Sequence, residues 1–219
     1  MSGSFSIWDW LWGWLILLNV IGLFVVPIML LSLKANRHSV PGDQVSTVEL
    51  VRRGAEQGEV NAQYGLGHMY ENGRGVAQNF AEAMKWYRKA ADQGFAMAQF
   101  SIGWMYVNGH GVAQNNVEAA KWIRLAAVQG EAQAQFFLGL MYANGRGVEK
   151  NDVEYMAWIR KAAEQGNAKA QSELGVIYAT GRGIAQDDAE AVKWFRKAAE
   201  QGEEVAQRNL ALMYRQGRG

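Results

Sequence analysis

The chain of 219 residues contains no cysteine, and it has only three histidines. Without cysteine there is no disulfide, no thiolate ligand and no thiol nucleophile. The histidines, His38, His68 and His110, are scattered along the chain, so we expect no metal site. The lack of cysteine suits a reducing compartment and is equally ordinary in the bacterial periplasm, so it does not assign a compartment.

The sequence also lacks the signatures of catalysis. An enzyme needs a nucleophile beside a base, a metal, or a pair of carboxylates in unequal environments, and no motif here supplies one. The glycine-containing segments are not followed by Gly-Lys-Ser or Gly-Lys-Thr, so a phosphate-binding loop has no support. We therefore expect no catalytic residue and no cofactor.

The chain also lacks an excess of positive or of negative residues. The chain has 22 lysines and arginines and 21 aspartates and glutamates, and Asp9 is the one acid before the repeats described below. There is no dense run of basic residues. Binding to nucleic acid is therefore not expected.

What the sequence does contain is a repeat of 36 residues without insertion or deletion. A period of this length is typical of a supersecondary unit that cannot bury its apolar face alone, so the units must stack. The marks that keep the register are Gln-Gly at positions 57, 93, 129, 165 and 201; Gly73/Gly75, Gly109/Gly111, Gly145/Gly147, Gly181/Gly183 and Gly217/Gly219; Tyr70, Tyr106, Tyr142, Tyr178 and Tyr214; and Trp86, Trp122, Trp158 and Trp194.

Each unit is predicted to hold two helices, which we name helix A and helix B. In the first full unit, helix A runs from about Glu59 to Asn72, with an apolar stripe at the spacing i, i+4, i+7, i+8. Gly73 ends helix A, because a residue without Cβ adopts the left-handed conformation easily. The stripe consists of Ala62, Leu66, Met69 and Tyr70, and that of helix B consists of Ala83, Trp86, Tyr87, Ala90 and Ala91.

Helix B is predicted to begin with a capping box. The side chain of the residue before the helix accepts a hydrogen bond from the amide of the third helical residue, and the glutamate at that third position accepts one from the amide of the capping residue. A match at every repeat makes the helix start a firm prediction. The pairs are Asn79/Glu82, Asn115/Glu118, Asn151/Glu154 and Asp187/Glu190.

Four glycines lie in the middle of the A helices, where glycine costs about 1 kcal/mol relative to alanine. Such a cost at equivalent places indicates that an adjacent helix approaches closely. The glycines are Gly67, Gly103, Gly139 and Gly175.

The pattern Ala-Gln-x-x-Leu-Gly-x-Met-Tyr-x-x-Gly-x-Gly-Val, followed by Ala-x-x-Trp-x-x-x-Ala-Ala-x-Gln-Gly, resembles the Sel-one-like repeats, relatives of the tetratricopeptide repeats. The resemblance covers about Asp43 to Gly219. It implies an all-α fold, a right-handed superhelical solenoid of antiparallel helix pairs, whose A helices line a concave surface that binds proteins or peptides.

The two ends depart from the pattern. Residues 43–56 form only a helix B, and the last helix A, about Glu203 to Gln216, has no helix B after it in the sequence. We expect its uncovered apolar face to dock on a partner or a second copy, giving a homo- or hetero-oligomer, with simple fraying as the alternative.

A binding stripe is predicted on the face of the A helices opposite Leu66. At 100° per residue, positions 64 and 68 point away from the core, and polar residues at 71 and 72 flank them. The alternative is that the 68-type side chains pack between neighbouring A helices. The predicted protein-binding residues are Tyr64, His68, Glu71, Asn72, Phe100, Trp104, Asn108, Phe136, Leu140 and Asn144.

The loop between the paired glycines carries Arg74, Arg146, Arg182 or Arg218, with His110 in the equivalent place. These cations suggest an anion site, but a solvated turn residue is the preferred interpretation.

Ahead of the repeats, Trp10 to Leu33 is an uncharged run of 24 residues. At about 1.5 Å per residue it is long enough to cross a bilayer. The sequence therefore predicts an N-terminal transmembrane anchor in residues 1–33, a linker in 34–42 and the solenoid in 43–219. A cleaved signal peptide is the alternative, but no Lys or Arg precedes the run.

Cations follow the span at Lys34 and Arg37, so the positive-inside rule puts the solenoid in the cytoplasm. We expect a single-pass protein of a bacterial inner membrane, with a periplasmic solenoid as the alternative. The predicted function is a membrane-tethered scaffold that binds a protein or peptide segment. The alternative is a structural subunit of a membrane complex, held by its transmembrane helix and its C-terminal end.

Overall fold

The computed structural model describes residues 41–218, with side chains from position 47 onward, and this part of the chain folds into ten α-helices. In order they are α2 (Pro41–Glu56), α3 (Val60–Asn72), α4 (Phe80–Asp92), α5 (Ala96–Asn108), α6 (Asn116–Val128), α7 (Ala132–Asn144), α8 (Asp152–Glu164), α9 (Ala168–Thr180), α10 (Asp188–Glu200) and α11 (Glu204–Arg215).

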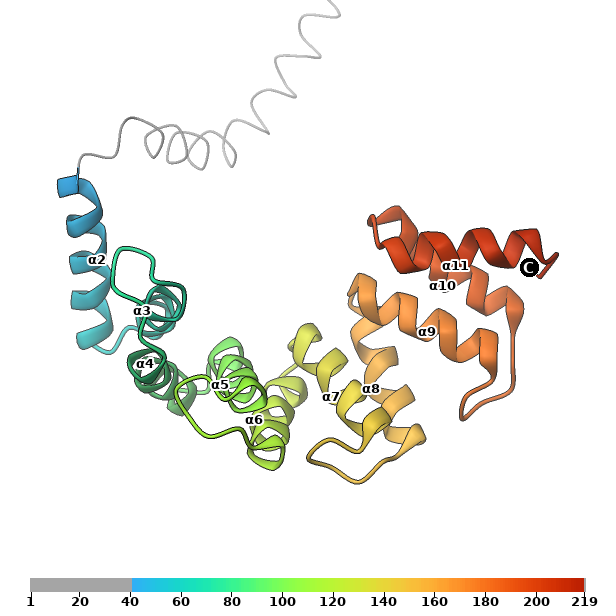
Figure 1. The fold of residues 1–219 in the computed structure, drawn as a ribbon, viewed down its shortest axis with the longest axis horizontal. Coiled ribbons are helices and arrows are strands. Elements are labelled where there is room, and N and C mark those ends of the chain that lie inside the picture. The colour runs from blue at the N-terminus through green and yellow to red at the C-terminus, as the bar shows by residue number, and fades with distance from the viewer. Residues whose placement is uncertain (1–40, 219) are drawn as a thin grey trace, which may run out of the picture. The chain divides into compact units, whose positions relative to one another are not determined.

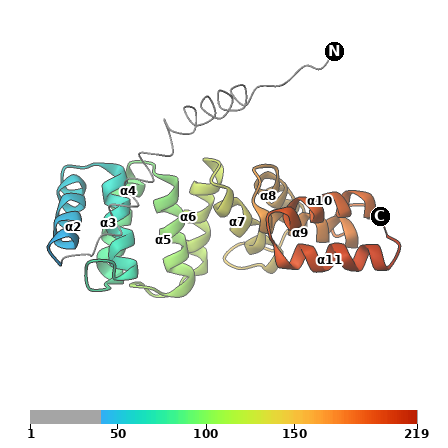
Figure 2. The same cartoon turned by 90° about the horizontal axis from the view of Figure 1, so that it is seen from above.

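The helices of residues 50–219, which form one compact unit, stack in sequence order. The odd-numbered helices α3 to α11 are the predicted A helices, and α4, α6, α8 and α10 are the B helices. Figure 1 shows the pairs following one another in a curved row, and Figure 2 shows the same row turned by 90°. The predicted all-α solenoid with 36-residue repeats is confirmed.

The predicted B-helix starts are correct. The side-chain oxygen of Asn79 accepts from the amide of Glu82 at 3.1 Å, and the same bond forms in every later repeat. The second half of the capping box is absent. The amide of Asn79 donates instead to the carbonyl of Tyr70 at 2.9 Å, and Glu82 pairs with Lys85. The preceding A helix thus takes the amide that the glutamate was expected to bind.

The mid-helix glycines allow helix A to touch its own helix B. A Cβ on Gly67 would lie 2.6 Å from the ring of Tyr87, and one on Gly103 would lie 2.5 Å from Ile123. At Gly139 and Gly175 the nearest atoms, at 2.9 Å and 2.6 Å, belong to the residues 20 positions later on the B helix. The prediction of close helix approach is confirmed, and at each glycine even a methyl group would require the side chain on the B helix to shift.

A ladder of glutamines, in which each rung joins an exposed glutamine to a buried one, explains the recurring Gln-Gly. The side chain of Gln165, at the C-terminus of α8, donates to the Oε1 of Gln135 at 2.7 Å. Gln135 in turn donates to the carbonyl of Ala127 in the preceding repeat at 3.1 Å. The glycine that follows, Gly166, has φ +89, which favours glycine. Equivalent rungs join Gln93 to Gln63, Gln129 to Gln99 and Gln201 to Gln171.

The recurring tyrosine and tryptophan also have structural roles. Each tyrosine hydroxyl accepts from an arginine 18 residues earlier, such as Arg160 to Tyr178 at 3.1 Å. In three B helices a lysine ammonium lies over the tryptophan ring, as Lys89 does at 3.9 Å from the centroid of Trp86. These contacts tie each B helix to the next repeat and cover its exposed side.

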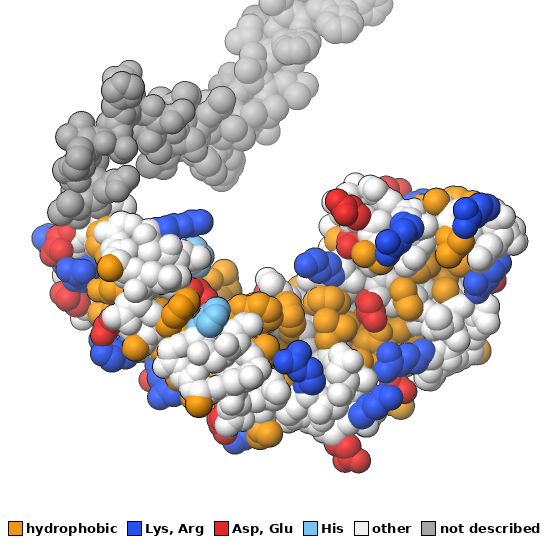
Figure 3. Space-filling model, in the orientation of Figure 1, with side chains coloured by type: hydrophobic (Ala, Val, Ile, Leu, Met, Phe, Trp, Pro, Cys, Tyr) orange, Lys and Arg blue, Asp and Glu red, His pale blue; other side chains and the backbone are white. Residues whose placement is uncertain are grey.

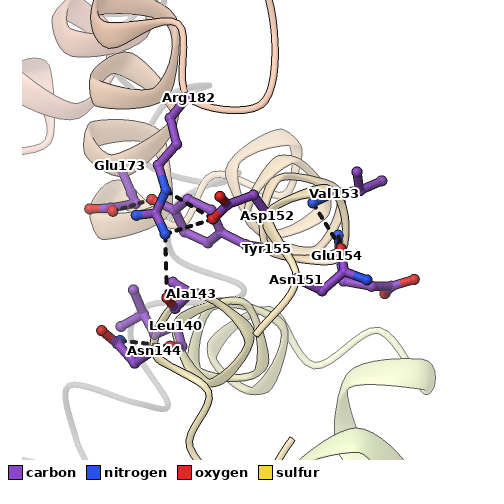
Figure 4. Close-up of polar contacts among 10 residues, drawn as sticks. All are labelled: Leu140, Ala143, Asn144, Asn151, Asp152, Val153, Glu154, Tyr155, Glu173 and Arg182. Carbon is purple, nitrogen blue, oxygen red and sulfur yellow. Dashed lines mark hydrogen bonds and ion pairs between the residues drawn. The ribbon is translucent and has the colours of Figure 1, made fainter. Parts of the chain in front are cut away.

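Two of the loop arginines, Arg182 and Arg218, are not free turn residues, so the preferred sequence interpretation is wrong at these two repeats. Arg182 donates to Oδ1 of Asp152 at 2.7 Å and 3.0 Å and to the carbonyl of Ala143 at 3.3 Å (Figure 4). Arg218 makes the same ion pair with Asp188. The loop of one repeat is thereby fastened to the helix start of the repeat before it.

The predicted anchor in residues 1–33 lies outside the described residues. No helix in residues 41–218 is both long and apolar enough to span a bilayer. The last two residues of the predicted linker, Pro41 and Gly42, belong to α2, which starts two residues before the expected position 43.

Candidate binding groove

The A helices present one regular exposed line of side chains. On α5 this line consists of Met97, Ser101, Trp104 and Asn108, at the spacing i, i+4, i+7, i+11. On α7 the equivalent positions are Gln133, Phe137, Leu140 and Asn144. In both helices the outer two residues are exposed and the inner two are half-buried. We call this surface the groove. In Figure 3, hydrophobic side chains gather in the middle of the hollow side of the solenoid.

Two aromatic residues form the centre of the groove. The rings of Trp104 and Phe137 are 5.1 Å apart between centroids, in an edge-to-face arrangement. Phe137 also contacts Phe100 at 5.5 Å and Phe136 at 5.6 Å. The four rings join α5 to α7, and the half-buried members leave part of their faces open to a ligand.

The 68-type positions lie on the exposed line of the A helices. Trp104 and Leu140 are half-buried there, and His68 is half-buried with its ring 6.4 Å from that of Tyr64. The alternative, that the 68-type side chains pack between neighbouring A helices, holds in part, because the ring of Trp104 on α5 contacts that of Phe137 on α7 and Leu140 packs against the hydrophobic core.

The 64-type positions do not face the groove, and this part of the prediction is wrong. Phe136 is only 8% exposed and belongs to the hydrophobic core. Tyr64 packs against Tyr87 at 5.5 Å and Phe95 at 5.2 Å, and Phe100 packs on the core. Tyr64 thus packs within its own repeat, whereas Phe100 reaches Phe137 in the next one.

The polar rim is partly engaged in the protein's own hydrogen bonds. Asn72, Asn108 and Asn144 are exposed, and each donates one Nδ2 hydrogen to the carbonyl four residues earlier, at 2.9, 2.8 and 2.8 Å. Each amide keeps its oxygen and its second hydrogen for a ligand. Glu71 differs, because its carboxylate accepts from the hydroxyl of Tyr87 at 2.5 Å.

Two tyrosine–carboxylate contacts lie beside the groove. Burial raises the pKa of Tyr87, and the hydrogen bond and negative charge of Glu71 raise it further. Burial also raises the pKa of Tyr155, which donates to Glu173 (Figure 4). Both tyrosines therefore stay neutral at physiological pH and act as donors.

A pocket of about 450 Å³ opens at one edge of the groove, between α5 and α7. Four predicted site residues line it, namely Trp104, Asn108, Leu140 and Asn144. Sequence reasoning missed Phe137, Gln114, Asn116 and Arg146, which also line it. Phe137 carried a signal, because its equivalents Gly65, Ser101 and Glu173 are small or polar.

In the part of the chain that the structure describes, no three His, Asp or Glu side chains come together in a way that could hold a metal ion. The arrangement offers apolar surface, amide groups and one arginine, which suit the capture of a peptide.

The sequence model of the Sel1 repeat matches residues 60–95, 96–131, 132–167, 168–203 and 205–219. This is the repeat that the motif resembles. The comparison with curated proteins found no significant match.

Several solved structures are similar. A Sel1 repeat protein from Oxalobacter formigenes is 41% identical with a TM-score of 0.70, over 74% of this chain and 64% of that one. A protective antigen of uropathogenic Escherichia coli strains, with the same fold, is 44% identical with a TM-score of 0.74, over 77% of this chain and 36% of that one. An immunity protein from Pseudomonas aeruginosa is 25% identical with a TM-score of 0.52, over 73% and 59%. The chain thus spans less than two thirds of each relative's length.

Proposed function

Because the chain belongs to the Sel1 repeat family, we propose that it is a membrane-tethered scaffold that binds a segment of a partner protein in the groove. The observation that carries this proposal is the pair of half-buried rings of Trp104 and Phe137 at the centre of the exposed line. Large aromatic side chains held open in a concave surface are typical anchors for a bound peptide.

The rim of the groove supports the same proposal. The amides of Asn72, Asn108 and Asn144 recur every 36 residues along one line. Since one hydrogen of each is already fixed to its own helix, the orientation of each amide is set before a ligand arrives. A pre-oriented amide loses less entropy on binding a peptide backbone.

The proposed tether is the uncharged run Trp10 to Leu33. Its length fits a bilayer, and the cations after it favour a cytoplasmic solenoid in a single-pass bacterial inner-membrane protein. A reporter that is active only in an oxidising compartment, fused after Gly219, tests this orientation. We expect no activity, and an active fusion contradicts the cytoplasmic placement.

Photocrosslinking from the groove tests the scaffold function. A photoreactive residue at position 104 should capture a partner in intact cells, and one at position 125, on the outer side of α6, serves as the control. F137A, added to the chain that carries the photoreactive residue at position 104, should abolish the captured species while the helical content is unchanged. Capture from position 125 but not from position 104 contradicts the groove.

A second candidate function is a structural subunit of a membrane complex. It is favoured by apolar side chains exposed away from the groove, with Leu125 50% and Val128 71% exposed on α6. Deletion of residues 1–40 separates the two functions. A scaffold should still bind its partner in solution, whereas a subunit held by a membrane span should not.

A further inference from the structure

The junction between the second and third matched repeats lacks a contact that the next two junctions make. At those junctions a loop arginine pairs with an aspartate 30 residues earlier, Arg182 with Asp152 and Arg218 with Asp188. Here the equivalent residues are Arg146 and Asn116. The neutral side chain at the helix start removes the negative charge that would hold the arginine.

Both side chains are left without a partner in the part of the chain that the structure describes. Arg146 is exposed, and its guanidinium makes no hydrogen bond or ion pair with a described residue. The Oδ1 of Asn116 is buried and accepts no hydrogen bond there. A buried acceptor without a donor is costly, so a turn of the Asn116 side chain that brings this oxygen into the pocket, where a ligand can donate to it, is favoured.

These two groups line the same pocket. Its volume of about 450 Å³ suits a single amino-acid side chain with its backbone. Trp104, Leu140 and Phe137 form apolar walls. One pocket thus holds a cation for a carboxylate, an acceptor for an N–H and apolar surface.

We infer that this pocket binds the C-terminal residue of a partner polypeptide that ends in an apolar side chain. The terminal carboxylate pairs with Arg146, the terminal amide N–H donates to Asn116, and the side chain lies against Trp104 and Leu140. The second amide hydrogens of Asn108 and Asn144 remain to bind the carboxylate or the carbonyl before it. The inference rests on the proposed groove function and names the part of the partner that the groove recognises.

Charge complementarity selects a chain terminus over an internal acidic residue. An internal Asp or Glu uses its side chain as the anion and leaves the apolar walls empty. A terminal apolar residue carries the carboxylate, the N–H and the apolar group on one Cα, so it satisfies all three parts of the pocket together.

A panel of fluorescent hexapeptides tests the inference with the 219-residue chain. The peptides are Gly-Ser-Gly-Ser-Ala-Xaa with each of the 20 amino acids at Xaa, prepared as the free acid and as the amide, and binding is followed by fluorescence anisotropy. We expect the free acids with Leu, Ile, Met or Phe at Xaa to bind best. Their amides should bind about tenfold more weakly or worse, because a charge-assisted pair is lost.

Three variants locate the effect. N116D should install the ion pair of the later junctions, close the pocket and reduce binding of the acids to the level of the amides. R146Q should do the same by removing the cation. The matched control is R182Q, at the next junction, which should leave acid binding unchanged, with thermal melting used to verify that each variant is folded.

If no acid binds better than its amide, the inference is wrong. Equal binding of acids and amides that W104A abolishes would overturn the terminal-residue inference and leave the groove function standing. Acid binding that W104A with F137A does not change would contradict both. Equal acid binding by N116D and the parent chain would also overturn the inference, since the carboxylate would then lie elsewhere.

Discussion

Gln135 is a polar residue buried inside the stack, where its side-chain hydrogen bonds offset the cost of burying it. It is 5% exposed, accepts from Gln165 and donates to the carbonyl of Ala127. A buried side-chain amide adds stability when its oxygen and its N–H are both hydrogen-bonded. If that amide is removed, its two hydrogen-bond partners are left unpaired.

Gln135→Leu should therefore lower the free energy of unfolding by about 2 kcal/mol, because Gln165 and the Ala127 carbonyl lose their partner. Urea unfolding followed by circular dichroism measures the change. Gln133→Leu, at an exposed position on the same helix, is the control and should change stability little. A loss of equal size in both variants would contradict the role of the ladder.

Gly139→Ala should destabilise the fold by about 1–3 kcal/mol, because the new methyl group overpacks the contact between α7 and α8. The Cβ would lie 2.9 Å from Cδ1 of Ile159, an atom that Ile159→Val removes. The double variant should recover part of the loss, measured by thermal melting. Additive losses would show that the two side chains do not meet as described.

Tyr155→Phe should change how stability depends on pH. Burial raises the pKa of Tyr155 above its ordinary value of 10.0, so the folded protein keeps the proton more firmly than the unfolded chain. The stability that results is complete below pH 10 and is lost as the pH rises through the folded-state pKa. The variant should thus lose less stability between about pH 9 and pH 11 than the parent chain. Unfolding in urea at both pH values is the measurement, and parallel losses would refute the assignment.

At this scale the sequence predicted contacts made within one repeat and failed for contacts between repeats. The mid-helix glycines and the side-chain acceptor at the start of each B helix follow from local geometry, and both are confirmed, whereas the glutamate half of the capping box is absent. The prediction for Phe136 was wrong because its angle around the helix, measured from Leu138, shows only that the side chain points away from the core of its own repeat. Its burial depends on the next repeat, and the exposed line lies roughly 70° further around the helix at 100° per residue.

Among the helices, α6 differs from the other B helices on its outer side. The position held by Lys89, Lys161 and Lys197 elsewhere is Leu125, and the position held by Asp92, Glu164 and Glu200 is Val128. Leu125 is 50% exposed. In α6, Trp122 consequently lacks the ammonium that covers the tryptophan of the other three B helices.

Leu125→Lys should stabilise the fold by about 0.5 kcal/mol, since the new ammonium can lie over Trp122 as Lys89 lies over Trp86. The melting temperature measures the gain. Leu125→Gln, which is polar but uncharged, is the control and should gain less. A gain of the same size from glutamine would assign the effect to solubility of the outer face rather than to the ring contact.

The limits of the helices were predicted closely, because caps and glycines act within a few residues. Helix A of the first full repeat was expected from about Glu59 to Asn72 and runs from Val60 to Asn72. The loop arginines Arg182 and Arg218 were misjudged, because their partners Asp152 and Asp188 lie 30 residues earlier and on another repeat. Pairings over such a separation are set by the stacking and carry no local signal.

For the solenoid as a whole, stability should vary along the row. In α7 eight residues are buried, whereas in α11 only Ala206 and Met213 are. The free energy needed to open a helix rises with the buried surface that opening exposes. Hydrogen exchange should therefore be slowest in α6 to α8 and fastest in α11. Exchange followed by mass spectrometry tests this gradient. Uniform protection would indicate that the whole solenoid opens as a single cooperative unit.

The glutamine ladder always donates toward the amino-terminal side, first within a repeat and then to a carbonyl of the repeat before it, and successive rungs are separated by the same 36 positions. A copied unit of that length would arrive with both halves of each bond already in place. Gene duplication can therefore lengthen or shorten such a protein by whole units without redesign of the joins, whereas a single residue inserted between the two glutamines of one rung would disturb the spacing of that rung.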